Sequence, residues 1–173
     1  MRIMRPSSDL AGRDARRHSL QRLGMSLVLA YGAAAVGAIA SIGAPSFYAH
    51  LVRPVWAPPG GWFGPVWTVL YGMMGIALWR VWRVRPAKSR PVRLFFAQLA
   101  VNAAWSWLFF RLHLGAASFV WIVLLVVLLA ITVGAFWRVS RTAGALLLPY
   151  LAWVLFACAL TWAVWRANPA ALG

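Results

Sequence analysis

Apolar residues gather in five runs along the chain, separated by short polar segments. The runs cover approximately residues 23–44, 65–82, 92–110, 115–137 and 144–165. Each run is close to the roughly 20 residues that a helix needs to cross the apolar core of a membrane. Backbone groups in lipid have to be hydrogen-bonded within their own segment, so the runs predict helices. The pattern therefore predicts an all-α membrane protein, a bundle of five transmembrane helices.

The polar segments outside these runs divide the chain into an N-terminal tail and a transmembrane domain. Residues 1–22 are polar and basic and lack the apolar centre of a secretory signal peptide, which predicts a disordered or surface-lying cytoplasmic tail. Residues 23–173 form the predicted transmembrane domain. Within it, only the gap at residues 45–64 is long, and this gap places one long loop between the first two helices. Long loops of this kind often carry function.

The long loop leads into the stretch RPVWAPPGGWFGPVWTVLYGMMG, which covers residues 53–75. Its prolines and glycines are typical of turns and loops, so they predict a non-helical segment. Pro65 suits the first turn of the next helix, where its missing N–H group costs nothing. The tryptophans of this stretch fit either membrane-interface anchors or one wall of a ligand site, and the pattern alone does not separate the two.

The composition supports a membrane protein. Hydrophobic residues make up 63% of the chain and charged residues 11%, whereas soluble domains carry about 25% charged residues. The formal net charge of +15 does not indicate a nucleic-acid partner, because the basic residues lie in the tail and in short gaps rather than on one folded face. That placement suits membrane topology and anionic lipid headgroups.

The basic residues also predict an orientation. Fourteen of the 17 lie in the tail and in the gaps after the second and fourth runs, while Arg53, Arg111 and Arg166 lie on the other side of the predicted bundle. Cytoplasmic segments keep the excess of Lys and Arg. We therefore expect a protein of the bacterial cytoplasmic membrane with its N-terminus inside and its C-terminus outside.

Chemistry-bearing side chains are scarce in the apolar runs. Both carboxylates, Asp9 and Asp14, lie in the tail, and His18, His50 and His113 are too scattered for a metal site. The pattern therefore argues against a hydrolase, an ion-coupled pump, an intrinsic cofactor and a bound metal. What remains is a pocket of rings, amides and small residues, which suits a large, flat, mostly apolar molecule.

Candidates for this pocket lie on one face of the third run. Gln98, Asn102, Trp105, Ser106 and Phe109 share a helical face by their spacing. Amides at membrane depth need partners, so Gln98 is interpreted as a hydrogen-bonding link between helices. Asn102 fits either that role or a position facing a cavity, since it shares its face with Trp105.

The second and fifth runs hold further candidates. Trp67 and Tyr71 share one face of the second run, while Trp153, Ala157 and Thr161 recur at every fourth position of the fifth. Trp67 fits an interface anchor or a buried ring equally well. The small side chain of Ala157 leaves space in which a flat ligand can lie.

Small residues also recur at every fourth position of the first run, at Ala33, Gly37 and Ser41. Rows of this kind let helices approach closely. The close approach fits packing within one bundle or contact across a dimer, and the sequence does not separate these two roles.

Several of these stretches together resemble the TspO/MBR family of tryptophan-rich sensory proteins, whose animal members are translocator proteins or peripheral benzodiazepine receptors. The family pattern of a basic residue, Pro, Trp and Pro-Pro is matched at residues 53–59, and the Pro-Val-Trp-Thr segment at residues 65–68. The stretches QLAVNAAWSWLFF and PYLAWVLFACAL are similar to the third and fifth helices of the family. The resemblance covers residues 30–168.

The resemblance implies an integral membrane sensor or receptor, commonly a homodimer, that binds tetrapyrroles such as protoporphyrin or haem-related ligands under the first loop. The pocket positions that it implies are Trp56, Trp67, Tyr71, Asn102, Trp105, Trp153 and Ala157. Two alternatives stay open: a light-dependent porphyrin-degrading enzyme that uses Trp67 and Trp153, and a transporter of porphyrins or sterols. The loop is interpreted as a lid over the bundle.

Three places depart from the family pattern. Phe47 and Tyr48 stand where the family often has Trp-Tyr, and Thr161 stands where many members have Asn. The stretch LTWAVWR lacks the Tyr that the animal sterol motif requires before its basic residue, here Arg166. Sterol binding therefore has less support than tetrapyrrole binding.

Overall fold

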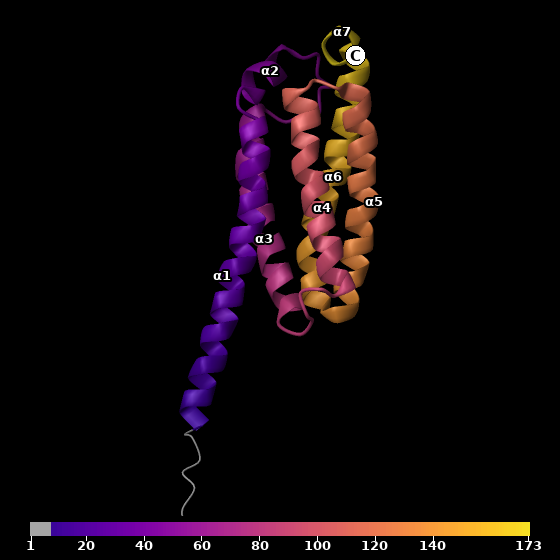
Figure 1. Ribbon diagram of the computed structural model, residues 1–173. Helices are drawn as coiled ribbons and strands as arrows, with labels where there is room; N and C mark the ends of the chain where they lie inside the picture. Colours follow the sequence, from indigo (N-terminus) through magenta and orange to yellow (C-terminus); the bar gives the residue numbers. More distant parts are fainter. Residues whose placement is uncertain (1–7) are drawn as a thin grey trace, which may run out of the picture.

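A computed structural model describes residues 8–173, without the side chains of residues 8–12 and 15, and no strand occurs among the described residues (Figure 1). The helices are α1 (Ser8–Ala40), α2 (Ala44–His50), α3 (Phe63–Trp82), α4 (Arg90–Ser106), α5 (Gly115–Val139), α6 (Arg141–Ala167) and α7 (Pro169–Leu172). A 3-10 turn, η1 (Gly60–Trp62), precedes α3, and a π-helical turn, η2 (Trp107–Arg111), follows α4. The predicted all-α fold is confirmed.

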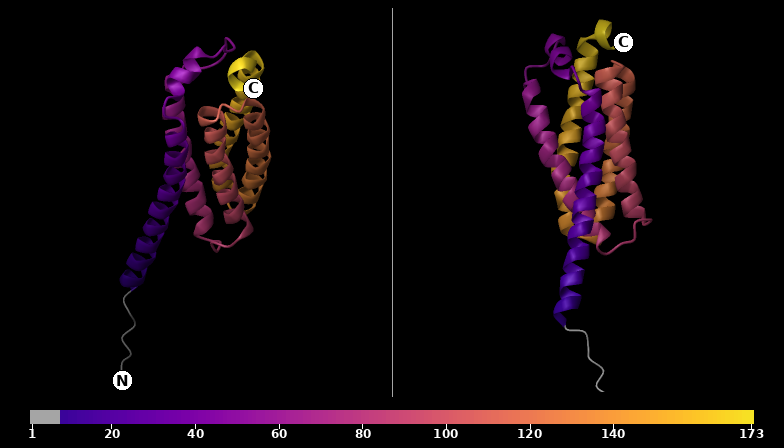
Figure 2. Two further views of the ribbon diagram at one scale, coloured as in Figure 1. Left: turned by 45° about the horizontal axis from the view of Figure 1, so that its top comes forward. Right: turned by 60° about the vertical axis from the view of Figure 1, so that its left-hand side comes forward.

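The five long helices form a closed ring. Helix α1 packs against α3 and α4, α6 packs against α3 and α5, and α4 packs against α5. In Figure 2 (right), α1 runs along the bundle between α3 and α4. Helices α2 and α7 and the C-terminus lie at the upper end of the bundle in Figure 1, and the α3–α4 and α5–α6 connections lie at the lower end.

Four segments are long and apolar enough to cross a membrane, among the residues that the structure describes. They are residues 16–40 of α1, η1 with α3, α5, and α6. Helix α4 is not among them, because it has 17 residues and carries the polar side chains of Gln98, Asn102 and Ser106. The number of membrane spans is therefore four by length and composition, and the fifth span stays a prediction.

The N-terminal segment is part of the first helix. Residues 8–22 were expected to be disordered or to lie along a surface, but they are helical and continue directly into the first apolar run. This part of α1 projects beyond the lower end of the bundle (Figure 1). A helix that is already nucleated by an apolar span extends at little cost, which explains why polar residues continue it. Residues 1–7 lie outside the described part of the chain.

The predicted loop at residues 45–64 is partly helical. Its first residues form α2, which follows Gly43 in the left-handed conformation (φ 87°) and has Pro45 in its first turn. The segment from residue 52 to residue 59 is non-helical, as its prolines predict. Helix α3 begins at Phe63, so Pro65 does lie in its first turn, where the N–H groups have no partner within the helix.

Candidate ligand-binding site

A cavity of about 370 Å³ lies in the upper half of the bundle, beneath α2. This volume is within the range of small-molecule pockets, about 300–1,000 Å³. The lining residues are Tyr31, Ala34, Gly37, Ala38 and Ser41 of α1, Ala44, Pro45 and Tyr48 of α2, Gly60 of η1, Phe63, Gly64, Trp67, Thr68 and Tyr71 of α3, Asn102, Trp105 and Ser106 of α4, Phe110 of η2, and Trp153 and Ala157 of α6.

The cavity forms because α1 and α3 separate towards the upper end. A methyl group added to Gly75 would lie 2.7 Å from Leu27 Cδ2 and 3.1 Å from Leu27 Cα, so the two helices touch there with room only for glycine. One turn higher on α1, Tyr31 Oη donates a hydrogen bond of 2.9 Å to the carbonyl of Thr68 on α3. Above this bond, α1 presents only small residues to the cavity, and space opens between the helices.

Aromatic rings from α3 and α6 pack in two groups that form one wall of the cavity. The ring centroid of Trp67 lies 5.6 Å from that of Tyr71 and 5.9 Å from that of Tyr150. Phe63 meets Trp153 edge-to-face at 5.9 Å. These separations are those of favourable aromatic pairs, so the rings hold each other in place and present fixed surfaces to the cavity.

Two hydrogen bonds between amides and phenols lie at the base of this wall. Asn102 Nδ2 donates to Tyr71 Oη at 2.9 Å, and one turn deeper Tyr150 Oη donates to Gln98 Oε1 at 3.0 Å. The interpretation of Gln98 as a link between helices is confirmed, since the bond joins α4 to α6. Asn102 combines the two roles that were left open, because it links α4 to α3 and also lines the cavity.

Two indole groups beside the cavity have unpaired N–H donors. Among the described residues, neither Trp105 Nε1 nor Trp153 Nε1 has a hydrogen-bond partner, although both atoms are buried. A buried donor without an acceptor costs about 1–3 kcal/mol. Because both Nε1 atoms are inaccessible to solvent, neither of them faces the open space of the cavity.

The roof of the cavity is built around Tyr48. Its Oη donates a hydrogen bond of 3.3 Å to the carbonyl of Pro58, which attaches α2 to the following loop. The guanidinium of Arg53 lies 4.9 Å from the centroid of the same ring. Burial raises the pKa of the Tyr48 phenol, and the Arg53 cation opposes that rise only in part. The phenol therefore stays neutral and keeps its hydrogen bond at physiological pH.

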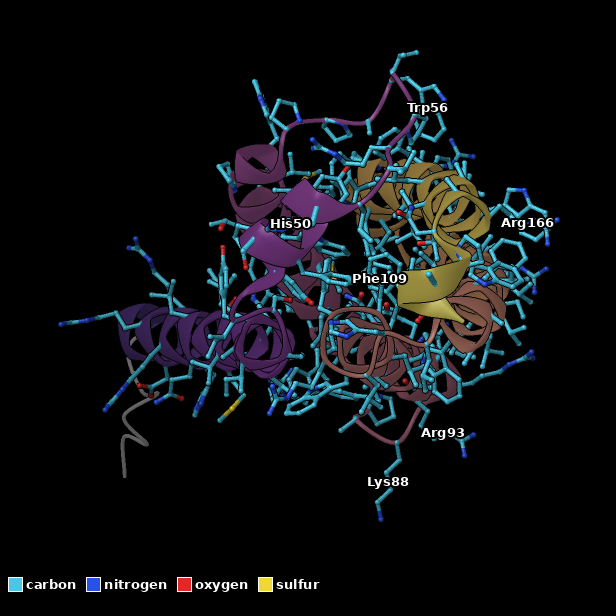
Figure 3. The ribbon with its side chains drawn as sticks, turned by 90° about the horizontal axis from the view of Figure 1, so that it is seen from above. His50, Trp56, Lys88, Arg93, Phe109 and Arg166 are labelled. Carbon is cyan, nitrogen blue, oxygen red and sulfur yellow. The ribbon has the colours of Figure 1, made fainter. Side chains whose placement is uncertain are left out.

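The structure brings together six of the seven predicted site residues. Trp67, Tyr71, Asn102, Trp105, Trp153 and Ala157 all line the cavity. Trp56 does not line it, and in this respect the sequence-based placement of Trp56 in the pocket differs from the structure. Its side chain is 48% exposed, lies at the outer rim (Figure 3), and meets Phe156 of α6 edge-to-face at 5.8 Å. The chain turns outward between Arg53 and Pro58, which carries this ring past the roof.

Other lining residues were not predicted as parts of a site. Gly37 and Ser41 were interpreted as packing residues, yet their row of small side chains forms the α1 wall. Ser106 shares the face of Asn102, and that spacing was a usable signal. Tyr48 and Phe63 gave no such signal, because only the folded loop brings their rings to 5.5 Å from each other over the cavity.

Comparison with known proteins agrees with this geometry. The family model described as TspO/MBR family matches residues 25–166. The chain is 43% identical over 127 residues to "Tryptophan-rich protein TspO" of Chlorobaculum tepidum. The aligned region covers 71% of this chain and 80% of that protein. It is 38% identical over 130 residues to "Translocator protein" of Homo sapiens, covering 70% and 75%, and 33% identical over 139 residues to "Tryptophan-rich sensory protein" of Cereibacter sphaeroides, covering 78% and 87%.

The matched span includes the whole cavity, because every lining residue falls between Tyr31 and Ala157. The long first loop falls within it as well, and two of the four apolar spans, residues 60–82 and 115–139, do so in full. Residues 1–24 and 167–173 lie outside the matched span. On these grounds the chain belongs to the TspO/MBR family of membrane proteins.

Proposed function

We propose that this protein is an integral membrane sensor or receptor that binds a tetrapyrrole, such as protoporphyrin or a haem-related ligand, in the cavity. The observation that carries the proposal is a lining of aromatic rings and small side chains in which no residue bears a charge. A flat, conjugated molecule stacks well on such rings. Relatives named tryptophan-rich sensory protein and translocator protein support a role in which a ligand is sensed or moved.

The polar groups of the cavity suit the edge of a tetrapyrrole. Asn102 is a polar side chain of the lining that a ring nitrogen or a carboxylate oxygen would meet. Arg53 lies above the cavity on the ring of Tyr48 and adds a cation near the roof. The combination favours an apolar ring system with acidic substituents over a fully apolar ligand such as a sterol.

The experiment is a titration of the full-length protein in detergent with protoporphyrin IX, followed by the absorbance of the porphyrin and by tryptophan fluorescence. We expect saturable binding, weakened roughly two- to tenfold in Trp67→Phe and Trp153→Phe, because each loses part of its ring contact. Trp137→Phe is the matched control, since Trp137 is 44% exposed and lies at the lower end. No saturation above a detergent blank would refute the proposal.

We also propose that α4 is the fifth membrane span. Helix α4 has 17 residues and continues into the five residues of η2, which together give roughly 33 Å at 1.5 Å per residue, about the thickness of the apolar core of a bilayer. Its amides Gln98 and Asn102 are buried against neighbouring helices. The lower end of the bundle, which carries most of the basic residues, would then face the cytoplasm.

Cysteine labelling tests the span count and the orientation together. In a Cys158→Ser background, single cysteines at Lys88 and Ala170 place thiols in two exposed positions at opposite ends. A membrane-impermeant maleimide added outside intact cells should label Ala170→Cys and leave Lys88→Cys unlabelled until the cells are opened. Labelling of both sites in intact cells would contradict the topology.

A further inference from the structure

We propose that a groove at the lower end of the bundle binds the phosphate headgroup of an anionic phospholipid. The groove is open, has a volume of about 750 Å³, and lies between α1, the end of α3 and the α3–α4 connection. It is at the opposite end of the molecule from the cavity. It is lined on the α1 side by His18, Arg22 and Met25, and on the other side by Trp82, Arg83 and Arg85.

The two walls of the groove are attached to each other by hydrogen bonds. Trp79 Nε1 of α3 donates to the carbonyl of Ser19 in α1 at 3.0 Å. Arg22 Nη1 donates to the carbonyl of Trp82 at 3.1 Å. The second bond also pairs one of the carbonyls left free at the C-terminal end of α3. Residues 19–22 of α1 are therefore held at a defined distance from α3, and the groove is a built feature.

The polar side of the groove is cationic. Arg22, Arg83 and Arg85 line it together with His18, and no lining residue is a carboxylate. The carboxylate nearest in sequence is Asp14, one turn before His18 on α1. Arg83 is further held by its position 5.0 Å from the centroid of the Trp79 ring. Guanidinium groups bind phosphate oxygens through paired N–H donors, so this set suits a phosphate group.

The apolar side of the groove distinguishes a lipid from free phosphate. Met25 is 55% exposed and Val84 is 65% exposed, and Trp82 lies where the apolar span of α3 ends. The groove thus sits at the level where a headgroup joins its acyl chains. Lys88 in the α3–α4 connection and Arg93 in the first turn of α4 point away from the bundle (Figure 3), so they are not part of the groove.

The test compares dioleoylphosphatidylglycerol with dioleoylphosphatidylcholine on the full-length protein in detergent, with bound lipid counted by native mass spectrometry. We expect tighter binding of the anionic lipid, reduced roughly tenfold in the double variant Arg83→Gln/Arg85→Gln. The control is Arg138→Gln/Arg141→Gln, which removes the same charge from exposed residues at the same end of the bundle. This control variant should still bind the anionic lipid more tightly than phosphatidylcholine.

Three outcomes would overturn the proposal. Equal losses in both double variants would indicate general attraction to a cationic surface. Equal binding of the two lipids, both of which carry a phosphate group, would exclude selectivity for an anionic headgroup. Displacement of the anionic lipid by inorganic phosphate at similar concentration would assign the groove to free phosphate. As a second variant, Ala87→Glu adds a carboxylate to the groove wall without removing any arginine, and it should also weaken the anionic lipid selectively.

Discussion

The side chain of Asn168 holds both backbone groups of Val52, a residue 116 positions away in the sequence. The N–H group of Val52 donates to Asn168 Oδ1 at 2.8 Å, and Asn168 Nδ2 donates to the carbonyl of Val52 at 2.9 Å. The same Nδ2 also donates to the carbonyl of Val164 at 2.7 Å. This pair of bonds ties the start of the non-helical loop to the end of α6, and so keeps the roof over the cavity.

Replacement of Asn168 should therefore loosen the roof. Asn168→Ala removes three hydrogen bonds worth about 1 kcal/mol each, two of them to Val52 and one to Val164. We therefore expect faster amide exchange at residues 51–59. If the loop covers bound porphyrin, affinity should fall roughly tenfold. Hydrogen exchange followed by mass spectrometry, together with porphyrin titration, measures both effects. Asn168→Asp keeps the acceptor for Val52 and should give an intermediate result, whereas exchange unchanged in both variants would contradict this role.

A larger side chain at Ala157 should block the cavity. Ala157 lines the cavity opposite α1, so Ala157→Leu fills part of the space in which a ligand would lie. We expect loss of porphyrin affinity of at least tenfold with little change in thermal stability, because the added atoms enter existing space. Ala159→Leu, at an exposed position two residues along α6, is the control and should bind as the wild type does. Equal affinities in the two variants would place the ligand elsewhere.

The contact between α1 and α3 should tolerate no side chain at Gly75. A methyl group there meets Leu27 at 2.7 Å, and overpacking of this kind costs about 1–3 kcal/mol. We expect Gly75→Ala to lower the thermal unfolding temperature in detergent. In Gly134→Ala, a methyl group meets nothing within 4 Å, so this variant should be as stable as the wild type or more so. The same melting temperature for both variants would show that α1 shifts freely.

The hydrogen bond between Asn102 and Tyr71 should behave as a coupled pair. Asn102→Leu leaves the phenol of Tyr71 without the donor that it meets at 2.9 Å, and we expect a loss of about 1–3 kcal/mol in stability. The double variant Asn102→Leu/Tyr71→Phe removes both polar groups and should recover much of that loss. A double-mutant cycle in thermal denaturation gives the coupling energy. Additive losses would mean that the two groups act independently.

Many of the residues that line the site could be predicted from the sequence, because helical spacing determines which residues share a face. Asn102 and Trp105 lie on one face of α4, Trp153 and Ala157 lie on one face of α6, and all four line the cavity. The same periodicity marked Gln98 as a link between helices, and its bond to Tyr150 confirms that reading. Residues that line one helix face could therefore be predicted without knowing which helices are neighbours.

The directions in which the loop side chains point could not be predicted in the same way. Trp56 and Tyr48 lie in neighbouring segments, yet Tyr48 forms the roof and Trp56 turns outward to Phe156. No periodicity governs a proline-rich segment, so the direction of each ring depends on tertiary contacts such as those of Asn168 with Val52. The helical state of residues 8–22 was likewise missed, because those polar residues continue a helix that the neighbouring apolar span begins.

By itself, the sequence determined that the chain forms apolar helices, which end of each helix carries the basic residues, and which side chains share a face, since these follow from local hydrophobicity and from the period of the helix. Only the tertiary structure decided that α1 and α3 close on each other at Gly75 and separate above Tyr31. The cavity results from that divergence, and a space between helices depends on side chains that are distant in sequence.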